Sequence, residues 1–296
     1  MRQVIDEAFL SMLEGHDLQV KNPMHGLFGG NRRSKAYGSS AEFADFREYA
    51  PGDDLRRIDW NLYARFEKLY LKLFVDERQL HHKIYLDTSA SMDWGEPSKA
   101  DTALKLAAAL GFLSVQAMDR VSFYAINENR CENLCQRVIG KEAFYAAADI
   151  LNQVEFHGDS DLNAAITQDL GNGDGISVII SDFLTDSDWK SAVDRLRYHE
   201  REVYLIQVLS PDELAPGMSG KVMLLDAEAL DIDDSRNQRA EVTRPAMKAY
   251  AEALQWLQRD MMTFCAARQV GYVSLCTNES IEKILFRNAT EAGLIL

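Results

Sequence analysis

The chain has 296 residues, of which 32 are basic, 46 are acidic and 47% are hydrophobic, and its formal net charge is −14. This composition is typical of a globular protein and excludes a disordered, collagen-like or low-complexity chain. A surface with this negative surplus repels phosphate groups, so nucleic acid and anionic membranes are not expected partners. The surplus is uneven, because residues 1–85 hold 13 basic and 13 acidic side chains and residues 86–296 carry all of it.

Residues 1–80 are predicted to form an irregular, β-rich extension that packs on a main domain made of residues 81–296. Four glycines interrupt residues 26–38, and Pro51-Gly52-Asp53-Asp54 is a turn sequence. The segment Leu69–Val75 is rich in strand-forming residues and predicts a strand that leads into the main domain.

Two features bear on the cellular compartment. The longest weakly polar stretch, residues 104–118, is shorter than the ~20 apolar residues of a membrane span, and the N-terminus has no apolar signal-peptide core. Cys131, Cys135, Cys265 and Cys276 form no CxxC pair and have no histidine at zinc-ligand spacing, which favours reduced thiols. We therefore expect a cytoplasmic protein without a membrane span.

From residue 83 onward, short apolar runs alternate with longer helical segments, a pattern typical of βαβ units. It predicts an α/β, three-layer, Rossmann-like sandwich with a mostly parallel central sheet. The expected strands are Ile84–Leu86, Val121–Ile126, Ile176–Ile180, Val203–Leu209, Val222–Leu225 and Tyr272–Leu275. The expected helices are Lys99–Met118, Lys141–Gln153, Leu162–Leu170, Trp189–Tyr198, Ala246–Arg268 and Ile281–Asn288. Residues 222–234 are expected to form a late strand or hairpin near the sheet edge.

Oxygen-bearing side chains follow the ends of three segments. Asp87, Ser89 and Ser91 alternate directly after the first strand, Ser160 stands in a loop before a helix, and Asp182 follows the strand Ile176–Ile180. In such sheets, ligands gather where loops leave the carboxyl ends of the strands. Carboxylates and hydroxyls without nitrogen or sulfur suit a hard cation, so we predict a Mg²⁺ (or Mn²⁺) site that leaves a coordination place for a partner's carboxylate.

The sequence Asp87-Thr-Ser89-Ala-Ser91 resembles the DxSxS motif of von Willebrand factor A domains and their metal-ion-dependent adhesion site. The resemblance implies a von Willebrand A-like domain whose site is completed by a hydroxyl from a second loop and an aspartate from a third. By position, these are similar to Ser160 and Asp182. Ser160 replaces the family's usual threonine, and Asp159 stands where the family often has glycine.

A longer ordered set of motifs, over about residues 15–185, is similar to the bacterial domain of unknown function 58 (DUF58) family. The family often has N-terminal membrane helices, and this chain resembles its short soluble form. The resemblance implies a metal-dependent adaptor or chaperone-like partner of a MoxR-type AAA+ ATPase. The motifs are Glu42-Phe43, Arg47-Glu48-Tyr49, Pro51-Gly52-Asp53-Asp54, Arg56, Ile58-Asp59-Trp60, Ala64-Arg65, Glu77-Arg78 and Asp87-Thr-Ser-Ala-Ser-Met92.

Three interpretations stay open at this point. The first, which we favour, is a non-catalytic, metal-dependent protein-interaction module. The second is a metal-dependent phosphoryl hydrolase with Asp87 as nucleophile, although Ser89 occupies the place where such enzymes carry a second aspartate. The third is a structural α/β module whose site no longer binds metal, an interpretation based on the departures at Ser160 and Asp159. Separately, the DxSxS residues could merely cap the next helix. The chain contains neither GxxxxGK[ST] nor GxSxG, so P-loop and serine-hydrolase chemistry are not expected.

Overall fold

The computed structural model of the chain describes residues 4–16, 43–74, 80–168, 175–185, 187–217, 220–224 and 238–284. The chain divides into two compact units, one formed by Met1–Leu27 with Leu80–Leu296 and the other by Phe28–Gln79. The predicted packing of residues 1–80 as a single extension on the main domain stays a prediction. Among the described helices, none is both long and apolar enough to cross a membrane.

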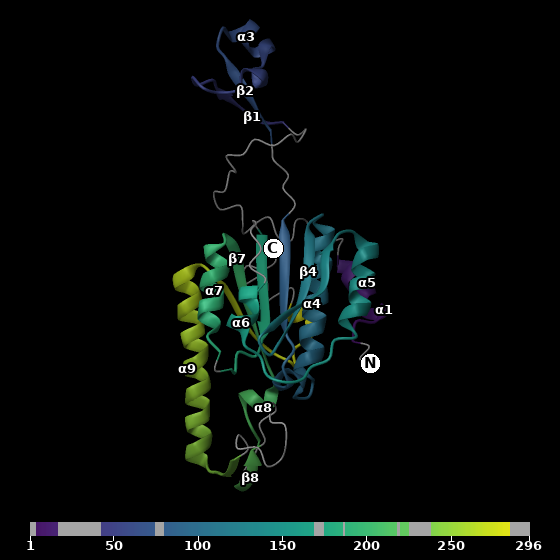
Figure 1. The fold of residues 1–296 in the computed structure, drawn as a ribbon, viewed down its shortest axis with the longest axis vertical. Coiled ribbons are helices and arrows are strands. Elements are labelled where there is room, and N and C mark those ends of the chain that lie inside the picture. The colour runs from purple at the N-terminus through teal and green to yellow at the C-terminus, as the bar shows by residue number, and fades with distance from the viewer. Residues whose placement is uncertain are drawn as a thin grey trace. The chain divides into compact units, whose positions relative to one another are not determined.

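A six-stranded sheet forms the centre of the larger unit (Figure 1). Its strands are, in spatial order, β10 (Gly271–Cys276), β7 (Arg201–Leu209), β6 (Gly175–Ser181), β3 (His81–Asp87), β4 (Arg120–Asn127) and β5 (Arg130–Val138). All neighbours are parallel except β4 and β5. The α/β fold predicted from the sequence is confirmed. The antiparallel edge strand β5 was not expected, because most of its side chains are polar and only Cys135 and Val138 are buried.

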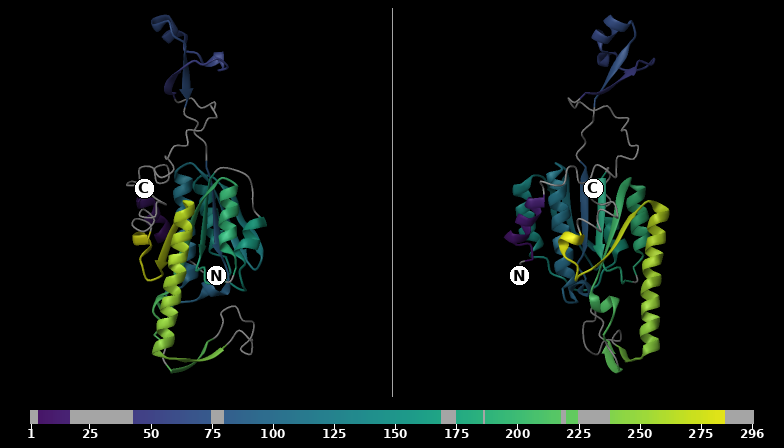
Figure 2. Two further views of the ribbon diagram at one scale, coloured as in Figure 1. Left: turned by 90° about the vertical axis from the view of Figure 1, so that its left-hand side faces the viewer. Right: turned by 180° about the vertical axis from the view of Figure 1, so that it is seen from behind.

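Helices cover both faces of this sheet (Figures 1 and 2). The five predicted segments between residues 99 and 268 are helical, with ends that differ from the predicted ones by a few residues. They are α4 (Lys99–Gln116), α5 (Lys141–Leu151), α6 (Leu162–Gln168), α7 (Trp189–Tyr198) and α9 (Arg244–Arg268). The last predicted helix is described only as α10 (Ile281–Lys283), since residues 285–288 lie outside the described residues.

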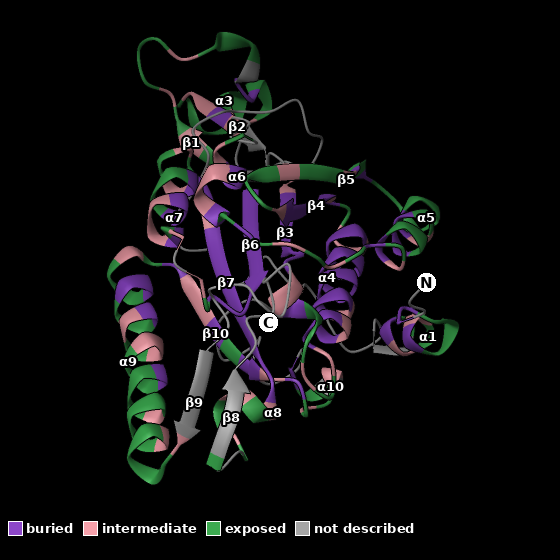
Figure 3. Cartoon of the chain, turned by 60° about the horizontal axis from the view of Figure 1, so that its bottom comes forward, coloured by how far each residue is buried: buried purple, intermediate pink, exposed green. Residues whose placement is uncertain are grey.

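Alternation along the strands supplies the core of each face. Phe123 of β4 packs under Gly111 of α4, where an added Cβ would lie 2.4 Å from the Phe123 ring. Tyr124, the next residue, belongs to the buried cluster that includes α6, α7 and α9 side chains on the other face. Figure 3 shows the central strands as mostly buried: all of β6 and all of β3 after His81 are buried, because helices cover them from both sides.

An N-terminal helix, α1 (Glu7–His16), belongs to the larger unit and was not predicted. Asn152, which follows α5, accepts hydrogen bonds from the backbone N–H groups of Val4 (3.1 Å) and Ile5 (3.0 Å) and donates one to the Ile5 carbonyl (3.0 Å). Val4, Ile5, Phe9 and Leu13 are buried. The segment before and within α1 is therefore anchored to the end of α5.

A late strand or hairpin near the sheet edge was expected over residues 222–234. The structure describes residues 222–224 of this segment, and they lie in a strand that is not part of the central sheet. β8 (Gly220–Leu224) pairs in antiparallel fashion with β9 (Gln238–Val242), and the two form a separate sheet. Short α8 (Pro211–Leu214) lies before them in the chain. The pattern of residues 222–225 predicts a strand correctly, but a strand pattern alone does not identify its partner strand.

The smaller unit contains a two-stranded antiparallel sheet of β1 (Phe43–Glu48) and β2 (Tyr70–Phe74), with the 3₁₀ turn η1 (Leu55–Arg57) and α3 (Trp60–Phe66) between them. The expected strand 69–75 is thus β2. Arg47 and Asp53 form an ion pair of 2.7 Å across the predicted turn. Asp59 caps α3 through the backbone N–H groups of its first turn and pairs with Lys72 at 3.2 Å.

Candidate functional site

The predicted oxygen-bearing loops meet at the point where the order of the sheet reverses. From β3 the chain crosses through α4 to β4 on one side, and β6 lies on the other side of β3. Leu86 of β3 and Ile180 of β6 are register partners, so the strand ends at Asp87 and Ser181 are adjacent. Such a switch point, at the carboxyl ends of parallel strands, is where open α/β sheets bind ligands.

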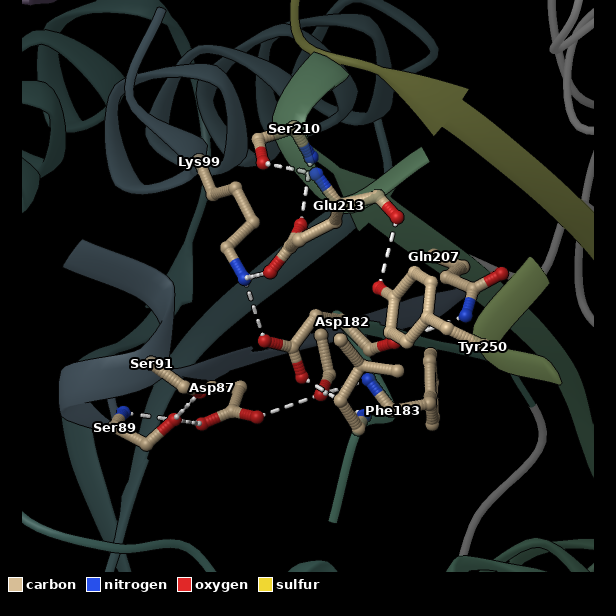
Figure 4. A network of polar contacts seen from close by, with 12 residues as sticks. Asp87, Ser89, Ser91, Lys99, Asp182, Phe183, Gln207, Ser210, Glu213 and Tyr250 are labelled. Atoms are coloured by element: carbon tan, nitrogen blue, oxygen red, sulfur yellow. Dashed lines mark hydrogen bonds and ion pairs between the residues drawn. The ribbon is translucent and has the colours of Figure 1, made fainter. Parts of the chain in front are cut away.

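Asp87, Ser89 and Ser91 form one hydrogen-bonded set, shown in Figure 4. Asp87 Oδ1 accepts from the Ser89 backbone N–H (3.0 Å) and from the Ser89 hydroxyl (2.8 Å). The Ser89 and Ser91 hydroxyl oxygens lie 3.1 Å apart. Asp87 and Ser89 are buried and Ser91 is partly exposed. The spacing of two residues thus directs three oxygen-bearing side chains into one small volume.

Asp182 lies beside this set, one residue beyond the end of β6. Its Oδ1 accepts from the Leu184 N–H (2.9 Å), and its backbone carbonyl accepts from Gln207 Nε2 (3.0 Å). Tyr272 donates to the other end of the Gln207 amide at 2.7 Å. The Asp182 carboxylate is thus hydrogen-bonded to its own loop, and the Asp182 backbone is tied to β7 through Gln207, which Tyr272 of β10 contacts in turn.

Ser160, the predicted hydroxyl from the second loop, is buried near the same edge. It forms an isolated parallel bridge with Glu128, just after β4, and its carbonyl accepts from Thr185 Oγ1 at 3.4 Å. Thr185 stands three residues after Asp182, so the second and third predicted loops touch. Among the described residues, none forms a hydrogen bond with the Ser160 hydroxyl.

Sequence reasoning missed Lys99, a buried lysine at the first turn of α4. Its ammonium lies 2.7 Å from Asp182 Oδ2 and 2.5 Å from Glu213 Oε1 (Figure 4). Glu213 belongs to a capping box with Ser210 at the start of α8. The box has a sequence pattern, Ser-x-x-Glu, that predicts a helix start. Nothing in the sequence places it against Lys99, since the residues are 114 positions apart.

Burial and charge act on these groups in opposite directions. Burial, followed by the negative charge of nearby Asp182, raises the pKa of Asp87, and the hydrogen bonds from Ser181 and Ser89 offset only part of this. Burial disfavours the charged form of Lys99, but Asp182 and Glu213 outweigh it and raise its pKa. The site therefore concentrates negative charge that one internal cation partly neutralises.

Helix capping was the alternative interpretation of the acidic and hydroxyl residues. It is correct for residues near the site in sequence, but not for Ser89 of the DxSxS motif. Ser98 caps α4 and Asp188 caps α7 through their side chains, and the Asp161 carboxylate accepts from the Ala164 N–H at 3.0 Å. Ser89 stands before a 3₁₀ turn but makes no side-chain cap bond. Asp186 lies outside the described residues.

The donors suit a hard divalent cation. The five candidate ligands offer only oxygen atoms, which Mg²⁺ and Mn²⁺ prefer. They are Asp87, Ser89, Ser91, Ser160 and Asp182. Hydroxyls make up most of the set, and within the described residues no group of three or more His, Cys, Asp or Glu is placed to hold a metal. The four cysteines form no disulfide among the described residues and lie elsewhere in the sequence. A cation here would keep several waters, as Mg²⁺ commonly does.

The fold and this oxygen-rich edge define an α/β sandwich protein with a candidate ligand site at its switch point. The chain belongs to the family described as "Protein of unknown function DUF58", whose family model matches residues 45–253. The resemblance noted in the sequence is thereby confirmed at the level of the family. An uncharacterized protein of Mycobacterium tuberculosis, Rv1480, and one of Mycobacterium bovis, Mb1516, are each 28% identical over 292 residues, covering 90% of this chain and 92% of theirs.

Solved structures with similar folds include two of note. A manganese-loaded TRAP protein of Plasmodium vivax is 14% identical, with a TM-score of 0.36, and the match covers 45% of this chain and 58% of that one. The VWA domain of SpRpn10 is 10% identical, with a TM-score of 0.40, and the match covers 71% of this chain and 94% of that one.

Proposed function

We propose that the protein is a non-catalytic, metal-dependent protein-interaction module. The observation that supports this most directly is the convergence of Asp87, Ser89 and Ser91 with Asp182 at the switch point of the sheet. Asp87, Ser89, Ser91, Ser160 and Asp182 would hold Mg²⁺ or Mn²⁺, directly or through water. The bound ion supplies a positive charge with an open coordination place, which a partner's carboxylate can fill.

The contacts of Asp87 favour binding over phosphoryl transfer. A nucleophilic aspartate of a phosphoryl hydrolase works with a second aspartate, two residues on, as general acid. Here Ser89 stands at that second position. Ser89 donates to Asp87 and cannot act as a carboxylic acid would. We therefore propose no enzymatic activity.

The partner follows from the family resemblance. We propose a MoxR-type AAA+ ATPase, or a client of one, that presents a glutamate, an aspartate or a C-terminal carboxylate to the ion. An acidic ligand would be repelled by the chain's net charge of −14 without the metal, so binding should depend on it. The protein would act in the cytoplasm, with no nucleic acid involved.

The test has two stages. Mg²⁺ should first raise the melting temperature of wild type, because an ion that binds only the native state stabilises it by mass action. The second stage measures capture of the purified ATPase at constant Mg²⁺ and nucleotide. It compares wild type with Asp87→Ala and with a control, Asp149→Asn, at an exposed position of α5. Capture by wild type and the control, but not by Asp87→Ala, supports the proposal. Equal capture by all three, or a flat Mg²⁺ titration, contradicts it and favours a structural module.

A further inference from the structure

Lys99 is a buried cation inside a site whose ligand set suits a cation. It is 1% exposed, and it stands at the first position of α4, where the helix dipole is itself positive. Burial and the dipole both oppose an ammonium at this place. The two carboxylates that it contacts, Asp182 and Glu213, offset that cost. A lysine so placed calls for a reason beyond packing.

Lys99 already holds one carboxylate oxygen of Asp182. The Asp182 Oδ1 accepts from the Leu184 backbone N–H at 2.9 Å, and its Oδ2 accepts from Lys99 at 2.7 Å. A divalent ion that binds Oδ2, directly or through water, has to share this oxygen with the ammonium or replace it. The ion and Lys99 also repel each other as like charges in a poorly hydrated region.

Glu213 gives Lys99 a second partner that stays in place. Its Oε2 accepts from the Ser210 backbone N–H at 2.7 Å, and its own N–H donates to the Ser210 hydroxyl at 3.2 Å. Its backbone carbonyl accepts from the Tyr250 hydroxyl at 2.8 Å, which ties it to α9. When a metal takes Asp182, Lys99 keeps a carboxylate partner without leaving its buried position.

We propose that Lys99 is an internal counter-cation that competes with the divalent ion for Asp182, and that Glu213 sets the strength of this competition. The inference rests on the proposed metal site and adds its regulation. Lys99 partly neutralises the acidic site and so stabilises it without metal, and it lowers the site's affinity for metal. Glu213 draws the ammonium away from Asp182 and so raises that affinity.

The experiment titrates the full chain with Mn²⁺ alone, and free Mn²⁺ is read by electron paramagnetic resonance. Lys99→Met keeps the length of the side chain and removes its charge. We expect it to bind Mn²⁺ at least tenfold more tightly than wild type. Lys105→Met, which removes a positive charge elsewhere on α4, is the matched control and should change the affinity less than twofold. Circular dichroism and urea unfolding establish that each variant is folded.

Glu213→Gln gives an independent arm with the opposite sign. Because Asp182 becomes the only carboxylate of the described residues that Lys99 contacts, Mn²⁺ affinity should fall at least threefold. Asp212→Asn removes an exposed charge from the adjacent position of α8 and should leave the affinity within twofold. If Lys99→Met does not fold, Glu213→Gln still tests the inference. Unchanged Mn²⁺ affinity in Glu213→Gln would then overturn it.

The outcomes separate this inference from the proposed function. If wild type binds Mn²⁺ and Lys99→Met binds it more tightly, both the inference and the proposed function are supported. Binding by Lys99→Met alone, with none by wild type up to tens of millimolar Mn²⁺, overturns the metal-dependent function and supports the competition. A folded Lys99→Met that binds no more tightly than wild type overturns the inference, whether or not wild type binds.

Discussion

The Ser181 hydroxyl donates a 2.6 Å hydrogen bond to Asp87 Oδ2, and it joins the ends of two neighbouring strands, β6 and β3. The same hydroxyl oxygen accepts from the Phe183 N–H at 3.0 Å, so it also shapes the loop that carries Asp182. Both side chains are buried. One serine thus connects the two carboxylate loops of the candidate site, although no motif includes it.

Ser181→Ala should destabilise the protein by about 1–3 kcal/mol, because it leaves a buried carboxylate oxygen without its donor. Urea unfolding followed by circular dichroism measures the change. Ser114→Ala is the matched control, since the hydroxyl of this buried serine donates only to the Leu110 carbonyl, one turn back in α4. A cost no larger than that of the control would show that Ser181 is not a support of the site.

Asn152→Ala should release the N-terminal segment. The amide makes three hydrogen bonds to the backbone of Val4 and Ile5, and an apolar replacement leaves these partly buried groups unpaired. We expect faster cleavage near residues 1–16 in limited proteolysis and a loss of about 1–3 kcal/mol in stability. Gln153→Ala, which removes an exposed bond to the Asp149 carbonyl, serves as control. Equal cleavage rates in the two variants would contradict this role.

Much of the fold was predictable because it depends on local pattern. The apolar runs at Ile176–Ile180 and Val203–Leu209 become central strands, because a strand that is covered on both faces is apolar throughout. The segment Lys141–Gln153 becomes α5, because a helix that is buried on one face has apolar residues at helical spacing. β5 was missed because an edge strand faces solvent and carries polar residues. α1 was missed because its anchor, Asn152, is about 147 residues away.

The site was predictable only in its local part. Asp87, Ser89 and Ser91 lie within five residues, and their spacing alone brings them together. Lys99 and Glu213 reach the site through tertiary structure, and lysine is not a residue type that a search for oxygen ligands would select. Lys99 directly follows the helix cap Ser98, where a positive charge interacts unfavourably with the positive end of the helix dipole. This is the one local sign in the sequence that Lys99 has a role at the site.

Gly111→Ala should be destabilising, although alanine favours helices by about 1 kcal/mol over glycine. The added Cβ would lie 2.4 Å from Cζ of the fully buried Phe123 ring, so α4 or β4 has to move. We expect a net loss of about 1–3 kcal/mol in urea unfolding. The double variant Gly111→Ala with Phe123→Leu should lose less stability than the sum of the two single-variant losses, because the shorter side chain removes the clash. Full additivity would contradict the close contact.

His81 should make stability fall as pH decreases below neutral. Burial, and then the positive charges of Arg201, Lys83, Arg120 and Arg137, lower the pKa of His81 to about 4. In the unfolded chain its pKa is about 6.5, so between these values the unfolded state binds the proton more readily. The neutral imidazole therefore contributes stability that is complete above pH ~6.5 and is lost as pH falls toward 4.

The comparison with His81→Gln isolates this contribution from that of the carboxylates. His81 is partly exposed, so solvent screening reduces the expected loss between pH 7 and pH 5 to about 1–2 kcal/mol. Wild type should lose that much more than the variant in urea unfolding at the two pH values. Glutamine can keep a polar contact to the Ser122 hydroxyl, which lies 2.8 Å from His81 Nε2. Parallel stability curves for the two proteins would show that His81 is protonated equally in both states.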